Sequence, residues 1–96
     1  MAQTKGEKMK VNMYSVRDQK GNTFNTPFLQ HTDAEAQRYV HSLVNFDKQS
    51  FVAKYPQDYD LYILGQIDLT TGKLEPLESP KHLIAAVQLK DSENMQ

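Results

Sequence analysis

The stretch from Tyr59 to Leu69, YDLYILGQIDL, decides the fold of this chain. Its apolar side chains fall on both faces of an extended chain, with Leu61, Ile63 and Ile67 on one face and Tyr62 and Leu64 on the other. A strand that is apolar on both faces is usually central and covered on both sides. We therefore expect residues 59–69 to be a central strand, with Gly65 marking a bulge or a close backbone approach.

Upstream of this stretch, residues 10–17 (KVNMYSVR) predict another strand, because β-branched and aromatic residues favour extended structure. Val11 and Met13 would lie on one face, and Tyr14 and Val16 on the other. Residues 18–22 have the composition of a hairpin loop. Residues 23–28 then predict a second strand, and Pro27, which has no amide donor, places that strand at a sheet edge or ends it.

The clearest helix runs from Thr32 to Val44. Thr32 at the N-cap and Glu35 three residues later form a capping box. One stripe at helical spacing is apolar and consists of Ala36, Tyr39, Val40, Leu43 and Val44. In the long connection that follows, we expect one short helical turn that covers the core and ends at Pro56; its apolar residues are Phe51, Val52 and Tyr55.

The C-terminal part predicts a fourth strand and a second helix. Residues 73–77 return after a turn, and Pro76 suggests an edge position. Ser79 at an N-cap and Pro80 at the first helical position favour a final helix. Its stripe would be Leu83, Ile84 and Val87, and a fifth strand from Leu83 to Leu89 is the alternative.

The predicted order is therefore β-β-α-β-β-α, a small α+β fold. It has a four-stranded, mainly antiparallel sheet with helices packed on one face. We expect residues 1–9 to be a flexible leader, residues 10–90 a single domain and residues 91–96 a frayed tail.

Composition excludes several classes of protein. The chain has no cysteine, which rules out a disulfide framework and fits a reducing cytoplasm. Its longest apolar runs are about five residues, far short of a membrane span. The polar N-terminus does not have the pattern of a signal peptide. We therefore expect a cytoplasmic protein that does not enter a membrane.

We find no pattern that supports catalysis. The three histidines, His31, His41 and His82, are scattered without metal-ligand spacing. No Gly-x-Ser-x-Gly elbow and no glycine-rich phosphate loop occurs. Asp58 and Asp60 lie two residues apart in a context typical of turns. We expect a protein without enzymatic activity, cofactor or metal.

Binding of nucleic acid has partial support in the charge pattern. The net charge is −1, yet residues 1–20 carry five basic residues against two acidic ones, and residues 56–80 carry five acidic residues against one lysine. Strand tyrosines can stack bases, and basic side chains can contact phosphates. The candidate residues are Lys10, Tyr14, Arg17, Lys20, Arg38 and Tyr62. Alternatively, the tyrosines belong to the core or to an interface, and the charges are simply solvated.

A set of motifs between Tyr14 and Leu83 resembles a known family. The motifs are Tyr14-Ser15-Val16-Arg17-Asp18, Pro27-Phe28, Ala36-x-Arg38-Tyr39, Val44-Asn45, Pro56-x-Asp58-Tyr59-x-Leu61-Tyr62-x-Leu64-Gly65-x-Ile67-Asp68, Thr71-Gly72 and Pro80-x-x-Leu83. This pattern is similar to the small nonstructural protein of gokushoviruses, the fifth open reading frame product of these bacterial microviruses. The resemblance covers about three quarters of the chain, and residues 56–68 are its most specific part.

The resemblance implies an early, non-virion protein of the bacterial cytoplasm that binds single-stranded DNA during genome replication or the switch to packaging. The alternative is a module that engages a viral or host replication protein, or the procapsid, without contacting DNA. We also expect a homodimer that buries Tyr62 and Leu64, because one chain is too small to cover both sheet faces.

Overall fold

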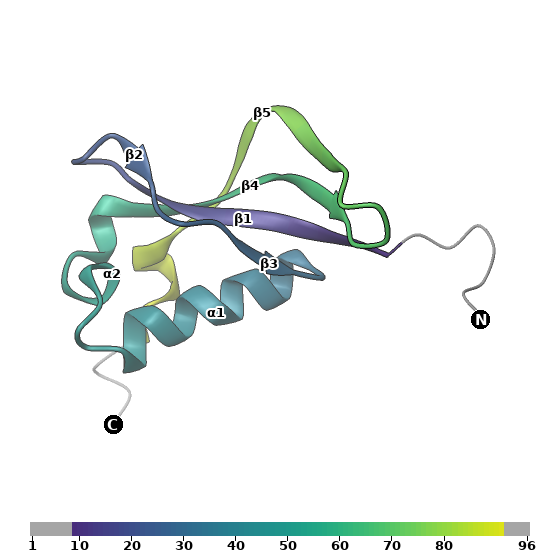
Figure 1. Ribbon diagram of the computed structural model, residues 1–96. Helices are drawn as coiled ribbons and strands as arrows, with labels where there is room; N and C mark the ends of the chain where they lie inside the picture. The colour runs from purple at the N-terminus through teal and green to yellow at the C-terminus, as the bar shows by residue number, and fades with distance from the viewer. Residues whose placement is uncertain (1–8, 92–96) are drawn as a thin grey trace.

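The computed structural model describes residues 9–91 of the chain. A curled antiparallel sheet lies on one side of the molecule and the helices lie on the other (Figure 1). The strands are β1 (Lys10–Asp18), β2 (Thr23–Phe24), β3 (Phe28–Gln30), β4 (Tyr59–Asp68) and β5 (Leu74–Ala85). The helices are α1 (Asp33–Phe46) and α2 (Phe51–Lys54), with the 3-10 turns η1 (Pro56–Asp58) and η2 (Ala86–Leu89). The expected small α+β architecture with an antiparallel sheet is confirmed.

Strand β4 is central, as its two-sided apolar pattern predicted. The sheet order is β2-β1-β4-β5, and β3 also pairs with β1. The β1–β4 register runs from Lys10 opposite Asp68 to Asp18 opposite Tyr59. We call the side of the sheet that packs on α1 the helix face and the opposite side the outer face.

A bulge at Leu64 changes which side chains share a face. Tyr14 pairs with Ile63, but Met13 pairs with Gly65, so Leu64 is an extra residue in β4. The alternation is therefore reset, and Ile67 pairs with Val11 on the outer face. The expectation that Ile67 shares a face with Leu61 and Ile63 was wrong, because simple alternation does not include the inserted residue.

The bulge depends on Gly65. Its φ is +155°, and a Cβ at this position would lie 2.6 Å from the Glu75 carbonyl oxygen and 2.6 Å from the Pro76 Cα. Both atoms belong to the backbone of β5, so the crowding cannot be relieved by rotating a side chain. The close approach that the isolated glycine predicted is present.

Helix α1 begins as predicted and covers the sheet with small residues. The Thr32 hydroxyl accepts a hydrogen bond from the Glu35 amide at 3.1 Å. Ala36, Val40 and Val44 are buried against the sheet. Tyr39, which the stripe also included, is 42% exposed, and its ring centroid lies 4.5 Å from that of Phe28.

The core lies between the helix face and α1. It contains two residues of β1, two of β4, the three buried residues of α1, and one residue each from α2 and η2. These are Tyr14, Val16, Tyr59, Leu61, Ala36, Val40, Val44, Val52 and Ala86. The predicted helical turn after α1 is present as α2, but only Val52 of that turn enters the core.

Two predicted elements differ from the structure. The second strand is divided into β2 and β3 around residues 25–27, since Pro27 cannot donate to the ladder. The helix predicted from Ser79 onward is wrong: β5 continues to Ala85 and only residues 86–89 form a helical turn. The long β4 needs a partner along its whole length, and pairs such as Tyr62 with His82 override the local helix signal.

The predicted leader and tail fall mostly outside the described residues, which exclude 1–8 and 92–96. Met9 is described, and its carbonyl accepts a hydrogen bond from the Leu69 amide at 2.7 Å. Asp91 is described too, and its amide donates to the Asn45 side chain at 2.8 Å.

The crowding at Gly65 gives a prediction about stability. We expect Gly65→Ala to cost about 1–3 kcal/mol more unfolding free energy than Gly72→Ala, because only the first variant forces a methyl group into backbone atoms. Gly72 also has a positive φ, of +79°, but no atom lies within 4 Å of a Cβ there. Urea denaturation of both variants measures the difference, and equal losses would contradict the role of the close approach.

Candidate nucleic-acid interface

Three rings cross the outer face and form what we call the outer aromatic row: Phe24 of β2, Tyr62 of β4 and His82 of β5. The Phe24 and Tyr62 ring centroids are 5.3 Å apart, and those of Tyr62 and His82 are also 5.3 Å apart. Both contacts are edge-to-face, so neighbouring rings present different sides to solvent. Tyr62 is half-buried and His82 is exposed, which leaves ring surface available for stacking.

Arg17 places a positive charge at one end of this row. It lies opposite Phe24 in the β1–β2 register, and its guanidinium carbon is 5.3 Å from the Phe24 ring centroid. The guanidinium also donates to the Asn22 side chain. Asn22 has a φ of 59°, a conformation that asparagine tolerates in turns, so the turn itself holds the arginine over the ring.

Asp60 fixes the other end of the row. Its carboxylate is mostly buried, accepts a hydrogen bond from Gln19 and lies 2.9 Å from His82 Nε2. A buried carboxylate needs such partners to offset its lost hydration. The consequence is that the His82 ring is held beside Tyr62 by a charged group beneath it.

The structure brings together only two of the six residues predicted to bind nucleic acid, Arg17 and Tyr62. Lys20 is exposed in the turn after β1 and lines a hollow next to α2. Arg38 lies on α1 and lines a separate shallow hollow with Tyr39 and His41. These two cations are therefore not part of the outer aromatic row.

Tyr14 requires a correction, because it lies on the helix face and is fully buried. Its hydroxyl donates to the Asp33 carboxylate at 2.7 Å and accepts from the Asn12 amide at 2.9 Å. Burial and the hydrogen bond to Asp33 raise the pKa of Tyr14 to about 12. This ring cannot stack a base; instead it ties β1 to the start of α1.

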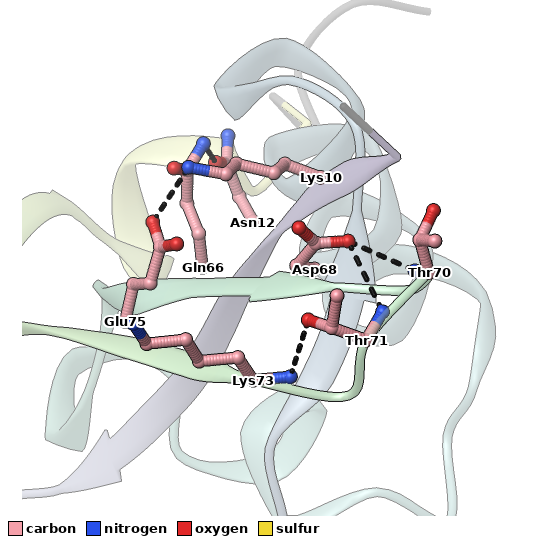
Figure 2. A network of polar contacts seen from close by, with 8 residues as sticks. All are labelled: Lys10, Asn12, Gln66, Asp68, Thr70, Thr71, Lys73 and Glu75. Atoms are coloured by element: carbon pink, nitrogen blue, oxygen red, sulfur yellow. Dashed lines mark hydrogen bonds and ion pairs between the residues drawn. The ribbon is translucent and has the colours of Figure 1, made fainter. Parts of the chain in front are cut away.

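Lys10 also lies on the helix face, inside a polar network at the far end of the sheet (Figure 2). Its ammonium pairs with Glu75 at 2.8 Å and so bridges β1 to β5 across β4. Beside it, the Gln66 amide donates to the Asn12 side chain at 3.0 Å. The Lys10 charge is largely engaged by Glu75, and we exclude Lys10 from the candidate interface.

Two members of the row, Phe24 and His82, were not predicted as site residues. Phe24 was recognised only as part of a strand, and His82 was assigned to the helix that the structure replaces with β5. Extending the return strand past Pro80 in its first register, Ile67 opposite Leu74, would have placed Ser79 opposite Tyr62; His82 reaches that position only through a register shift that the sequence pattern does not indicate.

Within residues 9–91, no group of three or more metal-ligating side chains is present. No helix in the same range is long and apolar enough to cross a membrane.

The fold and the outer aromatic row define a small α+β domain with an open sheet face suited to binding. A family model described as Phage ORF5 protein matches residues 11–89. The chain therefore belongs to the phage ORF5 protein family and is a phage accessory protein. No curated protein matches it, and neither does any solved structure. The resemblance drawn from the motifs is confirmed at the level of this phage family.

The buried Tyr14 hydroxyl predicts how stability responds to alkaline pH. We expect Tyr14→Phe to lower the unfolding free energy by about 1.5–3 kcal/mol below pH 10, because a hydrogen bond to a carboxylate is lost. In the parent protein, the unfolded state ionises near the ordinary tyrosine pKa of about 10, whereas the folded state keeps its proton to about pH 12. The Tyr14 contribution is therefore complete below pH 10 and is lost as pH rises through this window.

Urea denaturation of both proteins at pH 8 and at intervals up to pH 11.5 measures this effect. The difference between them should narrow as pH rises. Parallel stability curves would show that the hydroxyl has no raised pKa in the folded protein.

Proposed function

We propose that this phage accessory protein binds single-stranded DNA through the outer aromatic row. One observation carries the proposal. Arg17 lies beside Phe24, and the row of rings continues from Phe24 through Tyr62 to His82. Bases stack on aromatic side chains whatever their sequence, and arginine contributes both a cation–π contact and a phosphate contact. The row thus suits an unpaired strand, whose bases are free to stack.

The charge distribution sets the expected strength of this binding. The net charge is −1, and Arg17 is the cation in direct contact with the row. Affinity should therefore come mainly from stacking. The logarithm of the binding constant should fall only slowly with the logarithm of the salt concentration, with a slope of about −0.7 for each phosphate contact. Such modest, sequence-tolerant binding fits a protein that acts on a transient intermediate of the genome.

The resemblance to the gokushovirus nonstructural protein supports the biological setting of the proposal. In that setting the protein is made in the host cytoplasm, stays out of the virion, and acts during DNA replication or the switch to packaging. Single-stranded genome is the species that such a step produces, and it is the ligand that stacking rings accept.

Matched substitutions test the interface. We expect Tyr62→Leu to weaken binding of a fluorescein-labelled 12-nucleotide oligothymidine by about 5- to 150-fold, the range for losing one stacked base. Arg17→Gln should weaken it too and reduce the salt slope. Phe46→Leu and Arg38→Gln are the controls, because both side chains lie on α1 and neither lines the hollow that Phe24 lines.

Fluorescence anisotropy at low salt gives the dissociation constants of the parent protein and of the four variants. The proposal fails if the parent protein does not bind the oligonucleotide at tens of micromolar. It fails equally if the control variants lose as much affinity as the variants in the row.

A second candidate function is recognition of a viral or host replication protein without DNA contact. It is favoured by the half-buried apolar side chains that continue the outer face beyond the row, among them Met13 and Ile67. If this second function is correct, we expect the protein to co-purify with a replication protein from infected cells even after nuclease treatment. Loss of the partner on nuclease treatment would instead support the proposal that the protein binds DNA.

The same face is also the candidate surface for a homodimer, and a second copy there would compete with DNA for Tyr62. Tyr62 and Leu64 are half-buried in the single chain, so a second copy would cover them further. We expect light scattering to give twice the chain mass of 11.0 kDa at high protein concentration, and Tyr62→Glu to reduce it to one chain. A monomer under all conditions removes the dimer and leaves the DNA proposal standing.

A further inference from the structure

Helix α2 and the turn after β1 lie at the same end of the sheet (Figure 1), and residues of both line a second candidate binding site. A hollow of about 360 Å³ is lined there by Asp18, Lys20, Phe51, Tyr55, Asp58 and Tyr59. It lies on the helix side of the sheet and is separate from the outer aromatic row, which contributes none of its lining residues.

Two exposed rings form one wall of this hollow. Phe51 and Tyr55 are 65% and 50% exposed, although α2 is short and only its Val52 is needed for the core. Their spacing of four residues places both rings on one side of a helical turn. The turn is fixed by the Ser50 cap and by a hydrogen bond from the Tyr55 amide to the Phe51 carbonyl at 2.9 Å. The rings are therefore held in position rather than left on a loose loop.

Two carboxylates line the hollow together with the rings. The Asp18 carboxylate also accepts a hydrogen bond from the Gly21 amide at 2.9 Å. Asp18 ends β1 and Asp58 ends η1, and the Gln19 amide donates to the Asp58 carbonyl at 2.8 Å, which joins the two segments. Within the described residues, no hydrogen bond or ion pair engages the Asp58 carboxylate. This acceptor is therefore available to a ligand.

The charged residues that line the hollow are Asp18, Asp58 and Lys20, which gives the lining a formal charge of −1. Burial raises the pKa of the Tyr59 phenol, and the charges of Asp18 and Asp58 raise it further. The Lys54 ammonium lies 5.5 Å from the Phe51 ring centroid, so a cation already lies against this ring. The charge of the lining favours a positively charged occupant over a phosphate.

We propose that this hollow receives an arginine side chain from a basic segment of a partner protein. A planar guanidinium can stack on Phe51 or Tyr55 while its N–H groups donate to Asp18 and Asp58. Lys20, on the rim, carries an exposed ammonium that can move into solvent when the arginine enters. The site is a protein-binding surface that can be occupied while DNA lies on the opposite face.

The test uses the full chain, labelled with ¹⁵N, and an acetylated, amidated peptide of four arginines followed by NMR. We expect shifts confined to residues 18–20 and 51–59, with weaker binding of a four-lysine peptide, because an ammonium cannot stack and pair at once. No shifts at millimolar peptide would overturn the proposal. Identical shifts of these residues by a 12-nucleotide oligothymidine would also overturn it, because the hollow would then be a nucleotide site.

Matched variants separate a specific site from general attraction to acidic residues. Asp58→Asn should weaken peptide binding about tenfold or more through loss of a charge-assisted pair. Phe51→Leu should weaken it about 2- to 30-fold. The controls are Asp47→Asn and Phe46→Leu, which change an exposed carboxylate and an exposed ring outside the hollow. Equal losses in all four variants would reduce the effect to bulk charge and overturn the proposal.

Discussion

The antiparallel pairing of β1 with β4 is the interaction on which the rest of the structure depends. It sends Val16 and Leu61 to the helix face, where α1 covers them, and it places Arg17 opposite Asp60 on the outer face. A one-residue shift in this register would turn one of the two strands over, so that its core side chains would lie on the outer face. A change in this register would therefore disrupt both the core and the outer aromatic row.

The two ends of the sheet have different chemical character. At one end, Lys10 and Glu75 bridge three strands next to an amide pair, and the side chains satisfy one another. At the other end, the Asp58 carboxylate and the ring of Phe51 face solvent around a hollow. Cations that look like one group in the N-terminal sequence are thus divided between a structural bridge, the outer face and the rim of the hollow.

Sequence patterns predicted those parts of the fold that local physics determines. Thr32 and Glu35 marked the start of α1 because capping involves neighbouring residues only. The central position of β4 followed from its two apolar faces. Ser79 and Pro80, by contrast, have the local pattern of a helix start, yet β5 continues through them and pairs with β4 on both sides, at Pro76 and at Lys81.

The candidate site was less predictable for the same reason. Tyr14 and Tyr62 look equivalent as strand aromatics, yet the register buries the first beneath α1 and leaves the second on the outer face. Phe24 and His82 are candidate site residues only because their rings contact that of Tyr62. A surface composed of residues from three strands cannot be predicted from the sequence of any one strand.

The late position of β4 in the chain has a consequence for how the protein is made on the ribosome. The first half of the polypeptide contains β1, β2, β3 and α1, which have contacts with one another but lack the strand that completes the sheet. Until Tyr59–Asp68 emerges, Val16 and the buried stripe of α1 have no partner from β4. Contacts between segments so distant in the chain slow folding. The nascent domain therefore completes its fold only after β4 and β5 have emerged, and the segment from β1 to α1 is open to chaperones until then.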